Sequence, residues 1–394
     1  MGDIFSNAYL TIAASAAENG QQGLLNRREI QKFNKKHEGT DYTVCIRVGI
    51  EHEMRANVRP FPFETISTLR RRAWCLQEEL LSSRVVHFTK DEIIFVCREG
   101  TICECSPTWF AQFEFLPPVG STRKSLSKRW SDVVEHYSTR QISLRKDRLP
   151  ALSSLSHFFG KKSDNYLAGL WQSDMPMSLL WSTTGGRPAQ SLDTPYSEPP
   201  SWSWASIEGI VCDPLHIRPH AMDTREVAKV IEGHTYPSTK DPRGMVSGGH
   251  IIIRAPILRL VGVWFGPDTF TCRPGFDSGD QWMKASPCRG LLDDKGEASL
   301  LPSGVAVTPI FLLVICTSEI FLYNGKLLPP NEYLELKGLL VQSPMHLTGT
   351  QRTAMWTSGI ELACVRIGVG SIVTRRKISE EILAESVHST AIVF

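Results

Sequence analysis

The pattern of apolar and polar residues changes along this chain, and each pattern predicts a different element. Residues 9–14 are short and apolar and are closed by Ser15, which is typical of a strand buried on both faces. Residues 68–83 place apolar side chains at helical spacing and predict the clearest helix. The apolar runs 84–89 and 92–97 flank a short polar turn, which predicts a β-hairpin.

The rest of the chain divides at a loop. Further helices are predicted over 130–137 and 148–159, and one helix or a pair of short helices is predicted over 166–181. Residues 183–200 are rich in Gly, Pro and Ser and predict a linker. Strands are predicted over 42–48, where the run is half-buried, and over 202–205, 226–231, 250–253, 257–265, 310–316, 333–341 and 360–369.

These elements predict an α+β protein. We expect a helical central region with a β-hairpin around a truncated α/β core, followed by a β-rich carboxy-terminal half. The predicted domains are residues 1–182 and 201–394, joined by the loop 183–200.

Composition narrows the class of protein. The 394 residues are 42% hydrophobic and 21% charged, as in packed globular proteins. A net charge of +2 gives no electrostatic footprint for nucleic acid. The strongest apolar run, 305–316, is interrupted by Thr308 and Pro309 and is too short to span a membrane. With no signal peptide visible, we expect a cytoplasmic protein. We also expect that it does not bind nucleic acid and does not cross a membrane.

Motifs for catalysis are missing from the sequence. There is no GxSxG, HExxH, P-loop or helix-linked GxGxxG, and the ten cysteines form no CxxC pair. His216 and His220 have helical spacing, but neighbouring prolines argue against a helix and thus against a metal site. The sequence therefore predicts no catalytic residue, no metal and no cofactor, and favours a non-enzymatic protein.

One face of the helix over 68–83 carries polar groups beside a large aromatic ring. Trp74, Gln77 and Glu78 share this face, and Arg71 or Arg148 is a natural partner for the carboxylate. This arrangement is typical of a hydrogen-bonded core network, and a pocket for a ligand or partner is the alternative. The candidate binding residues are Arg72, Trp74, Gln77, Glu78, Arg84, Asp147, Arg148, Trp202 and Trp204.

The last two of these residues alternate along a predicted strand. Trp202 and Trp204 would then direct both rings to the same face. Such rings usually seal one layer of a protein onto another, and the alternative is an exposed platform for a sugar or a partner.

Six blocks of the sequence, in this order, resemble the fungal heterokaryon-incompatibility (HET) domain proteins. They are Ile4-Phe-Ser-Asn-Ala-Tyr-Leu-Thr-Ile-Ala-Ala-Ser15, Arg72-Ala-Trp-Cys-Leu-Gln-Glu78 with Leu81, Arg84, His87 and Phe88, Tyr137-Ser-Thr-Arg140, Asp147-Arg-Leu-Pro-Ala-Leu-Ser153, Tyr166-Leu-Ala-Gly-Leu-Trp171 and Pro200-Ser-Trp-Ser-Trp-Ala205. Family members carry a YVWG-like motif and a Trp/Asp/Cys block before the first of these, and Met1 follows both. The resemblance thus implies a HET domain without its first part, either in a naturally short member or through a late start of the gene model.

The resemblance implies a role in nonself recognition between fungal cells, ending in growth arrest or programmed cell death. We expect an intracellular interaction or signalling module with protein partners. One alternative is a TIR-like enzyme that processes nucleotides or NAD, with Glu78 as its acidic residue. The other is a carbohydrate- or partner-binding β-module that uses Trp202 and Trp204.

Overall fold

The computed structural model contains both helices and strands, which confirms the predicted α+β class. No described helix is long and apolar enough to cross a membrane. The structure describes all residues except 1, 26–27, 29, 47–66, 105, 111–120, 161–163, 189–198, 213–220, 266–268, 275–287, 293–309, 321, 324–325, 328, 330, 343–361 and 386. His216 and His220 lie outside the described residues.

The chain forms two compact units. The first comprises Met1–Arg129, Thr139–Ser143 and Ser154–Phe159, and the second comprises Trp130–Ser138, Leu144–Ser153 and Gly160–Phe394. The predicted domains 1–182 and 201–394 stay a prediction.

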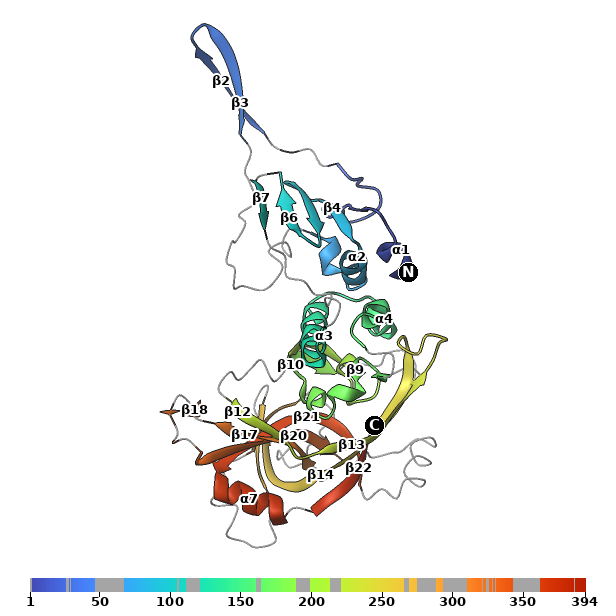
Figure 1. The fold of residues 1–394 in the computed structure, drawn as a ribbon, viewed down its shortest axis with the longest axis vertical. Coiled ribbons are helices and arrows are strands. Elements are labelled where there is room, and N and C mark those ends of the chain that lie inside the picture. Colours follow the sequence, from blue (N-terminus) through green and yellow to red (C-terminus); the bar gives the residue numbers. More distant parts are fainter. Residues whose placement is uncertain are drawn as a thin grey trace. The chain divides into compact units, whose positions relative to one another are not determined.

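The first unit is built on a five-stranded sheet in the order β1–β4–β5–β6–β7 (Figure 1). Strand β1 runs parallel to β4, whereas the other neighbours are antiparallel, so the β4–β5 pair confirms the predicted hairpin. Buried Ile94, Val96 and Cys103 form an apolar cluster on this sheet. The strands are β1 (Thr11–Ala13), β4 (Arg84–Phe88), β5 (Ile93–Cys97), β6 (Gly100–Cys103) and β7 (Ser106–Phe110).

Strand β1 differs from the prediction in its burial. It has the predicted parallel partner, but it lies at the edge of the sheet rather than inside it. Ile12 is 60% exposed and Tyr9 is 81% exposed, so the predicted burial on both faces is wrong. The reason is that, among the described residues, only β4 pairs with β1. The short helix α1 (Gly2–Ser6) precedes this strand.

The helix predicted over 68–83 is two helices. A 3-10 turn, η1 (Leu69–Arg71), is followed by α2 (Cys75–Leu81), because Arg72 has an extended backbone (φ −88°, ψ 129°). The Ala73 N–H donates to the Gln141 carbonyl at 2.8 Å instead of continuing the helix. Ala73, Leu76, Gln77 and Leu81 are buried, as expected for a helix inside its unit.

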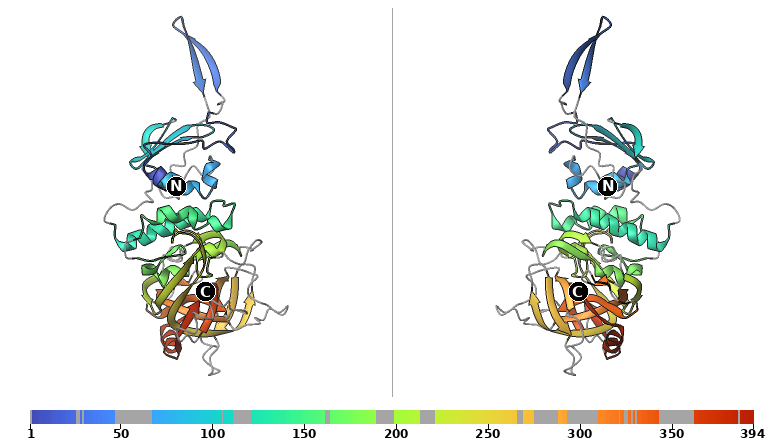
Figure 2. Two further views of the ribbon diagram at one scale, coloured as in Figure 1. Left: turned by 90° about the vertical axis from the view of Figure 1, so that its right-hand side faces the viewer. Right: turned by 90° about the vertical axis from the view of Figure 1, so that its left-hand side faces the viewer.

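A second antiparallel pair in the first unit is β2 (Gln31–His37) with β3 (Thr40–Ile46). Figure 2 shows it as a long hairpin, separate from the five-stranded sheet. Glu38 and Gly39 have φ values of 49° and 82°, which is the backbone of a two-residue hairpin turn. Strand β3 overlaps the strand predicted over 42–48, but every residue of it is exposed, so the predicted half-burial is wrong.

The second unit begins with helices that confirm two predictions with shifted ends. Helices α3 (Arg123–Ser138) and α4 (Pro150–Ser156) correspond to the helices predicted over 130–137 and 148–159. The first part of α3 and the last part of α4 belong to the first unit. A 3-10 turn, η2 (Arg145–Asp147), lies between these helices in the sequence.

A single helix over 166–181 is wrong, and the alternative of two short helices holds only after residue 171. The segment forms a tight hairpin of β8 (Tyr166–Leu167) and β9 (Leu170–Trp171), followed by the 3-10 turns η3 (Gln172–Asp174) and η4 (Met177–Leu180). The helix fails because Ala168 and Gly169 adopt positive φ values of 42° and 99°, which turn the chain back.

A nine-stranded sheet makes up most of the second unit and confirms the predicted β-rich half (Figure 1). Its order is β12–β17–β20–β21–β16–β15–β14–β13, with β22 paired to β14 and β21. Strand β14 also pairs with β17, so β14, β15, β16, β21, β20 and β17 form a closed circuit of hydrogen-bonded strands. The two runs predicted over 250–253 and 257–265 are one strand, β14.

The strands of this sheet are β12 (Ala221–Glu226), β13 (Lys229–Pro237), β14 (Val246–Phe265), β15 (Thr269–Pro274), β16 (Cys288–Leu292), β17 (Ile310–Ile320), β20 (Tyr333–Gln342), β21 (Leu362–Arg375) and β22 (Val387–Val393). Helix α7 (Arg376–Glu385) follows β21. Two further pairs lie outside the sheet, namely β10 (Ser182–Pro188) with β11 (Ile207–Cys212) and β18 (Leu322–Tyr323) with β19 (Lys326–Leu327).

Aromatic rings gather around the β8–β9 turn. The indole N–H groups of Trp130 and Trp204 both donate to the Gly169 carbonyl, at 2.9 and 3.1 Å. A Cβ atom at Gly169 would lie 2.5 Å from the Trp204 indole nitrogen. The turn therefore requires glycine twice, for its positive φ and for the close approach of the ring.

Replacing Gly169 by alanine tests this packing. We expect Gly169→Ala to lower the free energy of unfolding by about 3 kcal/mol, because strained φ and overpacking each cost roughly 1–3 kcal/mol. Gly20→Ala is the control, since a Cβ there meets nothing within 4 Å. Urea unfolding followed by tryptophan fluorescence measures both. Equal stability of the two variants would contradict the packing.

Candidate functional site

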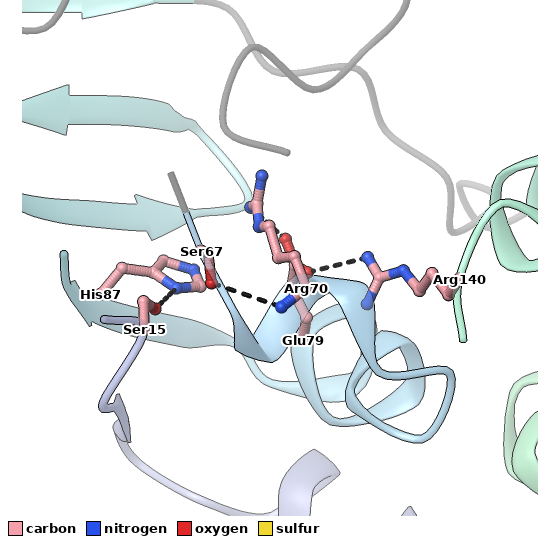
Figure 3. Close-up of polar contacts among 6 residues, drawn as sticks. All are labelled: Ser15, Ser67, Arg70, Glu79, His87 and Arg140. Carbon is pink, nitrogen blue, oxygen red and sulfur yellow. Dashed lines mark hydrogen bonds and ion pairs between the residues drawn. The ribbon is translucent and has the colours of Figure 1, made fainter. Parts of the chain in front are cut away.

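The first unit contains a buried group of charged side chains around Glu79 of α2. Arg70 from η1 forms an ion pair with one carboxylate oxygen of Glu79, and the Arg140 Nη2 lies 3.3 Å from the other (Figure 3). The side chains of Arg70, Glu79 and Arg140 are 4%, 6% and 2% exposed. Together with Ser15, Ser67 and His87 we call this group the Glu79 cluster.

The break between η1 and α2 is what allows this cluster to form. Arg70 and Glu79 are nine positions apart, and in one continuous helix they would be separated by roughly 13 Å along the axis. The extended Arg72 reverses the chain between them. The Gln141 N–H donates to the Arg71 carbonyl at 2.6 Å, and this contact places Arg140 beside the same carboxylate.

The ion pairs of the Glu79 cluster are buried. The guanidinium groups of Arg70 and Arg140 both contact the Glu79 carboxylate, one at each oxygen. Charge-assisted hydrogen bonds of this kind are strong when they are desolvated, and a buried charge that loses its partner is strongly destabilising. Glu79 is therefore the side chain that connects the two arginines.

Ser15 and His87 form the second part of the cluster. Ser15 follows β1 and His87 lies on β4, and the parallel register sets Ala13 opposite His87. The Ser15 Oγ and the His87 Nδ1 are 2.9 Å apart, and Ser15 and His87 are 0% and 6% exposed. The carboxyl ends of parallel strands thus bring these two side chains together. The His87 Nε2 is buried without a hydrogen-bond partner among the described residues.

Burial sets the charge of His87. Burial, and after it the nearby Arg70 guanidinium, lower the pKa of the imidazole to about 4. The imidazole is therefore neutral at neutral pH. Burial also raises the pKa of Cys75, on the same helix as Glu79, to about 11, so its thiol stays protonated. The His87 imidazole and the Cys75 thiol are thus both uncharged, and Ser15 is buried. This is typical of a structural core.

The predicted residues of the first unit do not all join this cluster. Arg72 is exposed, Trp74 and Glu78 are half-buried, and Gln77 is buried. Arg84 is exposed and stacks its guanidinium 5.0 Å from the Tyr9 ring centre. A binding role for these five residues stays a prediction.

The buried carboxylate is Glu79, not Glu78 as predicted. Burial raises the pKa of Glu78, and the nearby Arg72 lowers it, but the ion pairs form one residue further along. The prediction assumed one continuous helix, and the break at Arg72 changes which side chain of α2 faces Arg70. The proposed partner Arg148 lies in the second unit, where its guanidinium is 5.9 Å from the Trp204 ring centre.

Trp202 and Trp204 belong to the core of the second unit. They are 0% and 1% exposed, which removes the observation on which a sugar-binding platform rests. The predicted strand over 202–205 is wrong, because Trp204–Ser206 is a 3-10 turn, η5, capped by the Ser203 hydroxyl. Tyr137 packs edge-on against Trp204, and its hydroxyl donates to the carbonyl of Arg148 at 2.8 Å. Asp147 ends η2 and is half-buried.

Sequence reasoning overlooked most of the Glu79 cluster, although signals for it exist. Ser15 directly follows an apolar strand, and His87 and Arg140 lie in the blocks that resemble the HET family. What no pattern indicates is that Arg140 meets Glu79, because this depends on a backbone contact between segments about 70 residues apart. Among the described residues, no three His, Cys, Asp or Glu side chains are placed to hold a metal ion.

Neutralising the central carboxylate tests the cluster. Glu79→Gln keeps the shape of the side chain but removes the negative charge that both buried guanidinium groups contact, so we expect the free energy of unfolding to fall by about 3–5 kcal/mol. Glu78→Gln is the matched control and should cost less than about 1 kcal/mol, since Glu78 is half-buried. Chemical unfolding of both variants decides, and a larger loss for Glu78→Gln would contradict the assignment.

The low pKa of His87 predicts a dependence of stability on pH. Between its ordinary value of 6.5 and the folded value of about 4, the unfolded chain binds a proton that the folded chain does not. Stability is therefore complete above pH 6.5 and falls by about 1.4 kcal/mol for each pH unit below it. His87→Gln should lack this component. The free energy of unfolding of the unchanged protein and of His87→Gln is measured between pH 6.5 and 4.5. If it changes with pH by the same amount in both proteins, His87 is not buried in its neutral form.

Comparison with known families identifies the segment in which part of this cluster lies. Residues 1–78 match the family described as Heterokaryon incompatibility protein (HET), which is about a fifth of the chain. Comparisons with curated proteins and with solved structures gave no match. Ser15, Ser67 and Arg70 lie inside the matched segment, and Glu79 directly follows it. Residues 1–78 are thus the segment of this chain that is similar to the HET family, and we call them the HET-family segment.

Proposed function

We propose that this protein acts in heterokaryon incompatibility, the nonself recognition between fungal cells that ends in growth arrest or programmed cell death. The observation that carries the proposal is the HET-family match over residues 1–78. In this role the protein is a cytoplasmic interaction module, and its activity depends on contacts with other proteins.

The distribution of exposed apolar side chains supports action through contacts. Of the thirteen large apolar side chains that are exposed in the described residues, ten lie between positions 4 and 46, inside the HET-family segment. They are Ile4, Tyr9, Leu10, Ile12, Leu25, Ile30, Phe33, Tyr42, Val44 and Ile46. Exposed apolar residues are common singly, but a concentration of them marks a surface that contacts another molecule.

Part of this surface lies at the edge of the five-stranded sheet. Ile12, on β1, is 60% exposed, and Tyr9 and Leu10 precede it with exposures of 81% and 40%. An edge strand also has backbone groups that can pair with another chain. The core beneath it is fixed by Ser15 and His87, so the surface is presented on an ordered support.

The proposal predicts that a charge on this edge abolishes growth arrest. When the chain is overexpressed in a fungal host, the unchanged protein should stop colony growth, and Ile12→Asp should restore it. Ile231→Asp is the matched control, because Ile231 is a strand isoleucine that is 53% exposed but lies outside the HET-family segment.

Colony growth is scored, and immunoblots check that the three proteins accumulate equally. Normal growth with the unchanged protein would contradict the proposed function. Growth arrest that persists with Ile12→Asp would show that this edge is not the contact surface.

A further inference from the structure

The hairpin β2–β3 is exposed along its whole length. All seven residues of each strand are exposed to solvent. Among the described residues, neither strand has a second neighbour, so both outer edges carry unpaired backbone groups. A two-stranded hairpin is at best marginally stable in water, whereas three or more strands with an apolar face are stable. Pairing with further strands would therefore stabilise this hairpin.

The two faces of the hairpin differ in character. The register sets Phe33 opposite Val44 and Lys35 opposite Tyr42 on one face, and Ile46 lies on that face beside them. The exposed fractions of Phe33, Tyr42, Val44 and Ile46 are 45%, 50%, 46% and 51%. This face carries the four apolar side chains of the hairpin together with Gln31, Lys35, His37 and Thr40, and the register places no acidic side chain on it.

The opposite face is polar. Asn34 and Thr43 are directly opposite each other, and the Thr43 hydroxyl donates to the Asn34 Oδ1 at 3.0 Å. The remaining residues of this face are Lys32, Lys36, Asp41 and Cys45. Thr43 is the middle residue of β3, so any strand that pairs symmetrically with β3 is centred on it.

Charge distinguishes the two outer edges. Strand β2 carries Lys32, Lys35 and Lys36, so two copies of it side by side would repel. Strand β3 carries a single charge, Asp41. Pairing of β2 with β3 of another copy is a head-to-tail contact that does not close and would lead to open-ended assembly. The β3 edge is therefore the one that suits a closed pair.

We propose that β3 pairs in antiparallel fashion with β3 of a second copy of this chain, about a two-fold axis at Thr43. On the apolar face this register sets Tyr42 opposite Val44 of the second copy, an aromatic and β-branched pair that stabilises sheets. On the polar face it sets Asp41 opposite Cys45 of the second copy, so no like charges meet. The result is a four-stranded sheet in which the apolar side chains of both copies of β3 lie side by side on one face.

The hairpin lies within residues 1–78, so this inference rests on the proposed function and deepens it by naming a second copy as one contact partner. It concerns a different surface from the edge strand β1. Its test measures oligomeric state alone and is therefore separate from growth arrest.

The test places a charge at the centre of the paired strands. In the full-length protein, Thr43→Lys sets two like charges directly opposite each other across the two-fold axis, and should weaken dimerisation by about tenfold or more. Asn34→Lys is the matched control, because it adds the same charge and removes the same hydrogen bond. Asn34 lies on β2, so it is one strand away from the proposed contact between the two copies of β3. Sedimentation equilibrium of each protein measures the dissociation constant.

Mixing two variants excludes simple unfolding as the cause. Thr43→Glu alone should also be monomeric, whereas a mixture of Thr43→Lys and Thr43→Glu should recover the dimer, since opposite charges then meet at the axis. A monomeric wild type, or a Thr43→Lys protein that dimerises as well as Asn34→Lys, would overturn the inference. Neither result would touch the proposed function, which growth arrest decides.

Discussion

The first unit depends on one interruption of a helix. At Arg72 the backbone becomes extended, and the N–H of Ala73 and the carbonyl of Arg71 both bond to Gln141. This break turns Arg70 toward Glu79 and brings Arg140 to the same carboxylate. Without it, Arg70 and Glu79 would lie on separate turns of one helix, too far apart to form their ion pair.

The interior and the surface of the first unit differ in character. Inside, neutral His87 and Ser15 connect the ends of two parallel strands, and the arginine–glutamate pairs fix the helices beside them. Outside, the first unit exposes apolar side chains on β1 and on the β2–β3 hairpin. The polar core fixes the position of β1, and the proposed contacts with other proteins would use the apolar side chains that it exposes.

Local patterns in the sequence predicted the elements that local physics decides. The hairpin over 84–97, the helices α3 and α4 and the strands β14, β17, β20 and β21 follow from alternation and helical spacing. The failures have physical causes. Ala168 takes a positive φ that its side chain does not indicate, and strand β2 alternates around only one apolar residue, Phe33, so it carries little signal.

The sequence predicted the segment that holds the candidate site but not the side chains that form it. The sequence indicates the polar segment near position 75, yet it names Glu78 because a helical wheel assumes no break. Trp202 and Trp204 were expected on a strand and lie in and beside a 3-10 turn of the core. Contacts between distant segments, such as Arg140 with Glu79, are tertiary and leave no periodic trace in one sequence.

Native-state hydrogen exchange at the backbone amides of Ala73 and Gln141 tests the central claim most directly. Both N–H groups donate across the helix break, so the account predicts that they exchange as slowly as the amides of the central strand β5. Exchange of these two amides at the rate of the exposed β2–β3 turn would contradict it, because the break would then not hold the arginines at Glu79.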